Sequence, residues 1–193
     1  VEALVRAAVN RFGRLDSMVT NAAILADRRI DPLTLEAEIF DRVMAVNLRG
    51  TFLCARTAAR QMIEQGSGGS IVTVGSRASR RGNPSLPAYS ASKFGVIGLT
   101  QSLAMSFAPH AIRVNCVCPG SVDPDMTVPD WHNLADVEGT DVQAAKGKIS
   151  AGVPLGRLTS PTDVANAITW FASSAAAHVT GQSLNVNGGT WLN

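Results

Sequence analysis

Short runs of branched apolar residues alternate with long stretches of helical period along this chain. The runs are bounded by turn-forming residues and are typical of β-strands. They cover Ser17 to Asn21, Ser70 to Gly75, Ile112 to Cys118 and Ser183 to Asn187. Such alternation is expected of parallel strands joined by right-handed crossovers, in a sheet covered by helices on both faces. The pattern therefore predicts an α/β fold with a parallel, doubly wound sheet.

The predicted helices carry clear start and stop signals. Ser160 to Asp163 combines a capping hydroxyl, a proline at the first helical position and a carboxylate near the free amides, so a helix starts there. A second helix, Thr51 to Gln65, ends at Gly66, which suits a left-handed cap. A third, about Ala88 to Ala108, is apolar on more than one side. Either a partner subunit covers it or it is buried completely within one subunit.

The stretch from Ser121 to Pro154 has poor periodicity and mixes prolines with acidic and aromatic residues. It leaves the carboxyl end of a predicted strand, where ligands of open α/β sheets bind. We interpret it as a mobile excursion above the sheet that contacts substrate; the alternative is a solvated loop. Residues 1–193 are expected to form one domain that includes this loop.

Composition narrows the class of protein. The chain has 193 residues, of which 46% are apolar and 17% charged, as in an ordinary globular domain. A net charge of +2 argues against nucleic acid as a partner. No apolar stretch reaches membrane-spanning length and no leader pattern opens the chain, so we expect a cytoplasmic protein without a membrane partner. The basic cluster of Arg77, Arg80 and Arg81 is interpreted as a solvated loop, with contact to an anionic substrate as the alternative.

The sulfur and imidazole side chains do not form a metal-binding pattern. The three cysteines, Cys54, Cys116 and Cys118, make neither an even disulfide framework nor a Cys-x-x-Cys pair, and the three histidines are scattered. We expect the cysteines to be small buried side chains, and we expect no metal site.

Tyr89 and Lys93 are the strongest candidates for chemistry. Residues four apart share one face of a helix, so the phenol and the ammonium can point into the same cleft. A cation there favours the phenolate and would lower the pKa of Tyr89 toward working pH. Ser76 lies thirteen positions upstream, at the end of a predicted strand. The spacing alone is common on ordinary protein surfaces, so it needs support from the rest of the chain.

Taken together, the motifs resemble the classical short-chain dehydrogenase/reductase family over essentially the whole chain. The matching stretches are Leu15 to Ala23, Val46 to Thr51, Gly69 to Ser76, Tyr89 to Lys93, Arg113 to Gly120 and Gly181 to Gly189. The resemblance implies a Rossmann-like fold, of which this chain would be the C-terminal two-thirds of a three-layer αβα sandwich. It also implies a catalytic set of Asn47, Ser76, Tyr89 and Lys93.

In that set, Tyr89 would pass the proton, and Lys93 would lower the pKa of Tyr89 and bond the nicotinamide ribose. Ser76 would hydrogen-bond the substrate oxygen, while Asn47 would position a water that links Lys93 to solvent. Two of these residues have ordinary interpretations when taken alone. Asn47 could mark a helix kink, and Ser76 could be simple turn chemistry.

The implied reaction is reversible hydride transfer between NAD or NADP and a secondary alcohol or ketone, with a polyol slightly preferred on the likeness of the loop from Arg80 to Pro84. The cofactor-binding residues implied are Asn21, Ala22, Ala23, Tyr89, Lys93, Pro119, Gly120 and Val122. Pro124 stands where the family commonly has a threonine that holds the carboxamide, and a proline side chain cannot make that hydrogen bond. The expected partners are a small alcohol or ketone and further copies of the chain, in a dimer or tetramer.

One family motif is absent from this sequence. It has no Gly-x-x-x-Gly-x-Gly turn, and Val1 falls inside what resembles the helix before the fourth family strand. The strand from Ser17 to Asn21 would then be an exposed edge, which favours association or low stability. Strong hydrogen-exchange protection of the Val19 and Thr20 amides in a monomer would contradict this. The alternative function is a catalytically incompetent fragment or scaffold, which titration with dinucleotides would distinguish.

Overall fold

The computed structural model describes residues 1–122, 135–136 and 139–192, and in this part of the chain four parallel strands form one sheet. The strands are β1 (Ser17–Thr20), β2 (Gly69–Val74), β3 (Ile112–Pro119) and β4 (Ser183–Val186). They are hydrogen-bonded in the order β1-β2-β3-β4, with β1 paired to β2, β2 to β3 and β3 to β4 in parallel register. Each predicted strand is confirmed to within one residue at either end.

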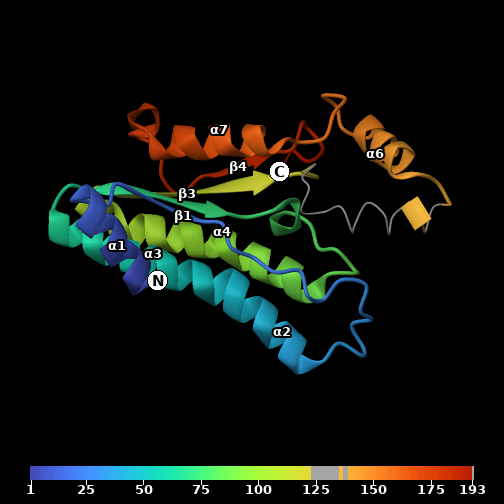
Figure 1. The fold of residues 1–193 in the computed structure, drawn as a ribbon, viewed down its shortest axis with the longest axis horizontal. Helices are drawn as coiled ribbons and strands as arrows, with labels where there is room; N and C mark the ends of the chain where they lie inside the picture. The colour runs from blue at the N-terminus through green and yellow to red at the C-terminus, as the bar shows by residue number, and fades with distance from the viewer. Residues whose placement is uncertain (123–134, 137–138, 193) are drawn as a thin grey trace.

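Helices cover both faces of this sheet (Figure 1). One face carries α1 (Glu2–Phe12), α3 (Gly50–Gln65) and α4 (Pro87–Phe107), and the other carries α7 (Pro161–Ala172). A further helix, α2 (Ala37–Met44), runs into α3 through a π-helical turn at Ala45–Arg49. Short 3-10 turns lie at Arg77–Ser79, Ala108–His110 and Ser174–Ala176. The predicted doubly wound α/β architecture is therefore confirmed.

The core consists of separate apolar layers because neighbouring residues of a strand face opposite sides of the sheet. Ile71 of β2 packs in the cluster that joins the sheet to α1, α3 and α4. The next residue, Val72, packs with Phe171 of α7 on the other face. Strands covered on both faces are buried at nearly every position, which is why β2 and β3 lack the alternating burial of half-exposed strands.

The helix caps lie where the sequence predicts them. The Ser160 hydroxyl accepts a hydrogen bond from the Asp163 amide at 3.1 Å, and the Asp163 carboxylate accepts one from the Ser160 amide at 2.8 Å. This is a reciprocal capping box, with Pro161 at the first helical position. Gly66 ends α3 with a φ of 67°, in the left-handed region.

The segment from Ser121 to Pro154 includes a helix that its poor periodicity did not predict, while its mobility and its contact with substrate stay predictions. This helix is α6 (Val142–Ala151). Asp141 caps its start, since the Asp141 Oδ1 accepts a hydrogen bond from the Ala144 amide at 2.8 Å. Only Ala145 of this helix is buried, so the helix has no broad apolar face that a periodicity search could find. Pro124 and the rest of residues 123–134 lie outside the described residues.

Strand β1 lies at the edge of the described sheet, as predicted. The side chains of Met18 and Thr20 are buried against the helices, whereas Val19 between them is 40% exposed. An apolar side chain and a free strand edge therefore face outward together. The association or low stability expected from this edge stays a prediction.

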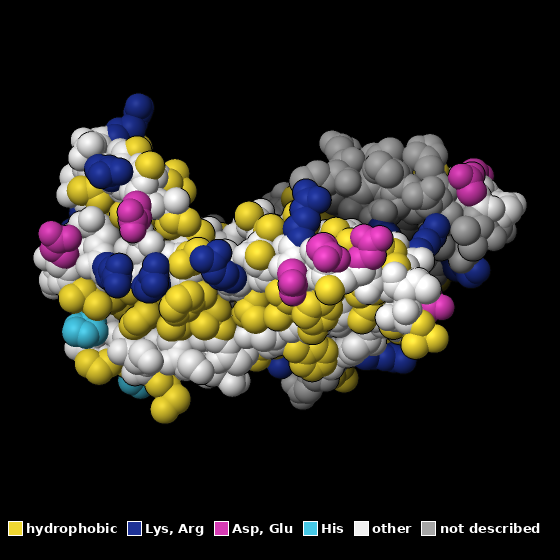
Figure 2. All heavy atoms as spheres, turned by 90° about the horizontal axis from the view of Figure 1, so that it is seen from below, with side chains coloured by type: hydrophobic (Ala, Val, Ile, Leu, Met, Phe, Trp, Pro, Cys, Tyr) yellow, Lys and Arg dark blue, Asp and Glu magenta, His cyan; other side chains and the backbone are white. Residues whose placement is uncertain are grey.

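A band of hydrophobic side chains crosses the helical face of the molecule (Figure 2). An apolar groove on α2, α3 and α4 and the π-helical turn that joins α2 to α3 is lined by Met44, Leu48, Phe52 and Leu99, with Gly95 at its floor. No helix in the described part of the chain is both long enough and apolar enough to cross a membrane.

Candidate functional site

The predicted site residues gather at the edge of the sheet where the strands end. In parallel strands all carboxyl ends lie along one edge, so the residues that follow β1, β2 and β3 are neighbours there. Asn21, Ala22 and Ala23 follow β1 and are exposed. Pro119 and Gly120, which end and follow β3, are half-buried. The predicted cofactor contacts thus flank the end of β2, which carries Ser76.

Val122 is the last of the predicted cofactor contacts. It is half-buried and forms a parallel β-bridge with Thr159, which ties the chain that leaves β3 to the start of α7. Gly120 is tightly enclosed at this point, because a Cβ added to it would lie 2.7 Å from the Cβ of Asn187. The turn after β3 therefore passes close to the turn after β4, and only glycine fits between them.

Ser76 begins a 3-10 turn directly after β2. Its hydroxyl accepts a hydrogen bond from the Ala78 amide at 3.1 Å, and its own amide donates to the Ser79 hydroxyl at 3.0 Å. This reciprocal box fixes the backbone on both sides of Ser76. The turn-chemistry interpretation of Ser76 is thus correct, and the same turn holds the serine in place beside Tyr89.

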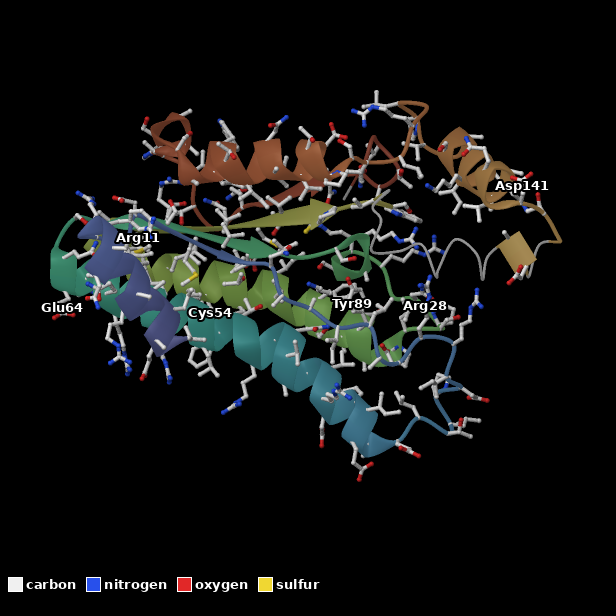
Figure 3. All side chains as sticks on the ribbon, in the orientation of Figure 1. Arg11, Arg28, Cys54, Glu64, Tyr89 and Asp141 are labelled. Atoms are coloured by element: carbon white, nitrogen blue, oxygen red, sulfur yellow. The ribbon has the colours of Figure 1, made fainter. Side chains whose placement is uncertain are left out.

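Tyr89 and Lys93 share one face of α4, as their spacing predicted. The Nζ of Lys93 lies 5.7 Å from the centroid of the Tyr89 ring. Lys93 is 3% exposed and donates a hydrogen bond to the backbone carbonyl of Val74 at 2.8 Å. Ser76 lies close enough to the Tyr89 phenol to influence the pKa of Tyr89. Tyr89 sits near the start of α4, on the side of the molecule to which the strand arrows point (Figure 3).

The pKa of Tyr89 differs from the expectation. Burial, which penalises the phenolate, raises the pKa of Tyr89 above its ordinary value of 10.0. Ser76 and the charge of Arg77 act to lower the pKa of Tyr89 but do not overcome burial, and the charge of Asp27 raises it further. The predicted lowering by Lys93 is therefore wrong for this structure. The sequence rule considered the neighbouring cation but not the desolvation of the phenol.

Burial also affects Lys93. It lowers the pKa of the Lys93 ammonium from 10.5 to about 8. The thiols of Cys116 and Cys118, 3.7 Å apart on β3, act in the opposite direction. Both thiols are buried, as expected of small core side chains, while Cys54 is half-buried. The buried amine therefore releases its proton at a lower pH than a solvated lysine does.

Asn47 lies at the centre of the π-helical turn and is fully buried. Its Oδ1 accepts from the Ile24 amide at 2.8 Å, and its Nδ2 donates to the Ile24 carbonyl at 3.0 Å and to the Ser92 hydroxyl at 3.1 Å. Asn47 thereby joins the chain after β1 to α4. Its position in a π-helical turn fits the interpretation of Asn47 as the mark of a helix irregularity, while its catalytic role and its water stay predictions.

Sequence reasoning missed two residues that support this set. Ser92 donates to the Tyr89 carbonyl at 2.7 Å and accepts from Asn47, so it connects the two helical segments. Asp27 is fully buried, and its Oδ2 accepts a hydrogen bond from the Tyr89 amide at 3.0 Å. An acidic residue in a mostly apolar stretch is a weak signal. The 62-residue separation between Asp27 and Tyr89 hides the contact from any local rule.

The three arginines do not all behave as a solvated loop. Arg77 is exposed and donates to the Ser121 hydroxyl at 3.1 Å. Arg80 is half-buried and binds the Ser183 carbonyl at 2.9 Å and the Asn185 side chain at 3.3 Å, which fixes the loop to β4. Arg81 lies over the Trp191 ring, 5.0 Å from its centroid. The solvated-loop interpretation is therefore wrong for Arg80, which has a structural role.

The donor set suits the nicotinamide half of a dinucleotide. An ammonium has three donors, and Lys93 uses one of them on Val74, which leaves two for ribose hydroxyls. Backbone groups at Asn21 and at the turn after β3 lie on either side. Among the described residues, no cluster of three His, Cys, Asp or Glu side chains could hold a metal ion.

Comparison with known proteins agrees with this geometry. A family model described as enoyl-(acyl carrier protein) reductase matches residues 1–190. A short-chain dehydrogenase/reductase of Armillaria gallica is 41% identical over 189 residues, which cover 98% of this chain and 70% of that protein. Galactitol 2-dehydrogenase of Agrobacterium fabrum is 35% identical over 193 residues, which cover 100% of this chain and 74% of that protein.

Among solved structures, sorbitol-6-phosphate 2-dehydrogenase from Erwinia amylovora superposes with a TM-score of 0.91 at 35% identity, covering 100% of this chain and 75% of that one. The family model, the sequence identities and the shared fold point to one assignment. The chain belongs to the short-chain dehydrogenase/reductase family.

Proposed function

We propose that the protein interconverts a secondary alcohol and a ketone, with NAD or NADP as the hydride carrier and Tyr89 as the proton donor and acceptor. The observation that carries this proposal is the grouping at the end of β2. There Ser76 lies close enough to the Tyr89 phenol to influence the pKa of Tyr89, and the Lys93 amine lies 5.7 Å from the centroid of the same ring. The nicotinamide, when bound, supplies or accepts the hydride.

Ser76 and Tyr89 act on the substrate oxygen. The Ser76 hydroxyl is a neutral donor that is fixed by its turn, so it can stabilise negative charge on that oxygen without moving. Tyr89 holds its proton firmly because burial raises its pKa. The resting phenol is therefore ready to protonate an alkoxide, which suits ketone reduction. Alcohol oxidation needs the phenolate and is favoured at higher pH.

Lys93 and Asn47 support Tyr89 in this proposal. Lys93 is held by the carbonyl at the end of β2, and its remaining donors can bind the ribose hydroxyls of the cofactor. Asn47 fixes the chain after β1 against α4. It thereby holds the proposed cofactor contacts that follow β1 in a constant position relative to Tyr89. Its proposed second task is to hold a water near Lys93.

A polyol or a simple ketone is the substrate that we favour. Two relatives with high coverage of this chain carry names of polyol enzymes, galactitol 2-dehydrogenase and sorbitol-6-phosphate 2-dehydrogenase. The 3-oxoacyl-[acyl-carrier-protein] reductase of Staphylococcus aureus is 37% identical to this chain, which supports an acyl chain as the alternative substrate. Assays with galactitol, a sugar-alcohol phosphate and a short β-ketoester separate these classes.

Replacement of Tyr89 by phenylalanine tests the proton-transfer role. Loss of the acid/base group is expected to reduce turnover by about 10² to 10⁴. Binding of the dinucleotide, measured by fluorescence titration, is expected to stay near the wild-type value because the ring remains. Near-normal turnover of Tyr89→Phe would refute the assignment. If the wild-type protein binds neither oxidised nor reduced dinucleotide, the scaffold alternative is correct.

We also propose that the protein forms a homo-oligomer through the helical face. Phe52 on α3 is 36% exposed, and Phe94 and Met105 on α4 are 46% and 80% exposed. These side chains lie on the helices that form the apolar groove, which makes the face more suited to a second copy than to water (Figure 2). Light scattering after size exclusion is expected to show a dimer or tetramer, and Phe94→Glu is expected to dissociate it. A monomeric wild-type protein would contradict the proposal.

A further inference from the structure

Helix α4 begins without a side-chain cap from its own sequence. Its N-cap residue is Leu86, whose side chain cannot accept a hydrogen bond from the free amides of the first turn. Asp27, 62 residues away in the chain after β1, fills this place, since its Oδ2 accepts from the Tyr89 amide at 3.0 Å. The residue that the cap holds is therefore the proposed proton donor itself.

The Asp27 carboxylate is an unusual choice for a simple cap. It is fully buried, and its second oxygen, Oδ1, has no hydrogen-bond partner among the described residues. Burial of a carboxylate with one oxygen unpaired costs free energy, whereas an asparagine caps helices about as well without a charge. The negative charge therefore has a cost that capping alone does not explain.

The charge acts on the Tyr89 phenol. A negative charge close to a phenol disfavours the phenolate, and Asp27 acts on Tyr89 in this direction. The groups that face Tyr89 from the other elements act in the opposite sense. They are Ser76 and Arg77 from the turn after β2. Lys93, one helical turn further along α4, lies 5.7 Å from the ring centroid. Asp27 balances a site that is otherwise rich in donors and positive charge.

We propose that Asp27 is a positioning residue that anchors the start of α4 at the Tyr89 amide and holds the Tyr89 phenol in its protonated, proton-donating form. This inference rests on the proposed role of Tyr89 in catalysis, but its test does not need catalysis. Asp27 would set the pH range in which the enzyme reduces ketones. It would do so without contact with the substrate.

Tyr89 is the only tyrosine in the 193 residues, so the ultraviolet absorbance of tyrosinate reports on this one side chain. The experiment titrates the chain toward alkaline pH and follows tyrosinate absorbance, with far-ultraviolet circular dichroism to show that the fold persists. Asp27→Asn keeps an oxygen for the Tyr89 amide and removes only the charge. It is expected to lower the titration midpoint by roughly half a pH unit or more.

Two further variants make the result specific. Asp31→Asn removes the same charge from an exposed position on the same stretch of chain and is expected to leave the midpoint unchanged. Asp27→Ser keeps a short capping oxygen without the charge. It is expected to lower the midpoint as Asp27→Asn does, and it replaces that variant if the asparagine protein does not fold.

An unchanged midpoint in a folded Asp27→Asn or Asp27→Ser protein would overturn the inference, as would an equal shift in Asp31→Asn. In the active enzyme, the alkaline limit of ketone reduction is expected to move to lower pH in Asp27→Asn by the same amount. An active Tyr89→Phe enzyme would refute the proposed function and leave the titration result intact. The two failures are therefore distinguishable.

Discussion

The Nδ2 of Asn47 donates to the hydroxyl of Ser92 over 3.1 Å, and this contact joins the π-helical turn to the helix that carries Tyr89 and Lys93. Ser92 in turn donates to the carbonyl of Tyr89. Asn47 and Tyr89 are thus connected through Ser92 by hydrogen bonds and not by closeness alone. In a dry environment, each of these bonds matters more for stability than it would at the surface.

Replacement of Ser92 by alanine tests this connection. The change removes two hydrogen bonds and leaves one Asn47 N–H without its partner, so we expect the free energy of unfolding to fall by about 1 to 3 kcal/mol. Turnover is expected to fall as well, because α4 is then held less firmly against the π-helical turn that carries Asn47. Denaturant unfolding and steady-state kinetics measure the two effects. The matched control is Ser106→Ala on the exposed face of α4, where the hydroxyl bonds only the Ser102 carbonyl. Equal losses in the two variants would contradict the connecting role.

Replacement of Gly75 by alanine tests the close packing behind Ser76. An added Cβ would lie 2.8 Å from the sulfur of Cys118 and 2.9 Å from the hydroxyl of Ser79, which is part of the Ser76 capping box. We expect a loss of about 1 to 3 kcal/mol in stability and a loss of turnover through displacement of Ser76.

The control for this change lies on α4. Gly98→Ala meets nothing within 4 Å, so it is expected to stabilise the helix by up to about 1 kcal/mol. Thermal unfolding of both variants decides between the two outcomes. A Gly75→Ala protein with wild-type stability and turnover would show that the packing is looser than the structure indicates.

The buried ammonium of Lys93 predicts a dependence of stability on pH. Its pKa in the folded protein is about 8 against 10.5 in the unfolded chain, so between these values the unfolded chain binds a proton that the folded protein does not. Stability contributed by Lys93 is therefore present above pH 10.5 and lost as the pH falls through about 8. Tyr89 acts oppositely only above its ordinary pKa of 10.0, because its pKa is raised.

Denaturant midpoints of the wild-type protein and of Lys93→Met measure this effect. From pH 8 to pH 10, the wild-type protein is expected to gain up to about 2 kcal/mol relative to Lys93→Met. The Lys93→Met protein lacks the titrating amine, so its pH profile shows the contribution of all other ionisable groups and serves as the reference for the wild-type protein. Parallel pH profiles of the two proteins would mean that Lys93 keeps an ordinary pKa.

The strands and the helices α3, α4 and α7 could be predicted from the sequence because their signals are local, whereas α2 was not predicted. The four consecutive residues from Ser160 to Asp163 mark the start of a helix. The strands are short runs rich in branched apolar residues and bounded by turn-forming residues. Helix α6 escaped prediction because its sequence lacks an apolar face. Its start at Asp141 is the local signal that was available.

Features of the candidate site could also be predicted where they depend on local sequence, and could not where they depend on the fold. The spacing of Tyr89 and Lys93 is a property of one helix and was predicted correctly, whereas the cap from Asp27 depends on a fold that brings distant segments together. The direction of the Tyr89 pKa shift depends on how much water the surrounding chain excludes. Neither property can be obtained from a motif.

The hydrogen bond from Lys93 to the Val74 carbonyl ties α4, the helix that carries Tyr89, to the last residue of a central strand. Ser76 follows two positions later on the same strand exit, so the proton chemistry is built into the layered scaffold and not into the surrounding loops. The loops above the sheet can then change in sequence without altering the positions of Tyr89, Ser76 and Lys93. An architecture of this kind allows evolution to vary the recognised substrate while the transfer step stays constant.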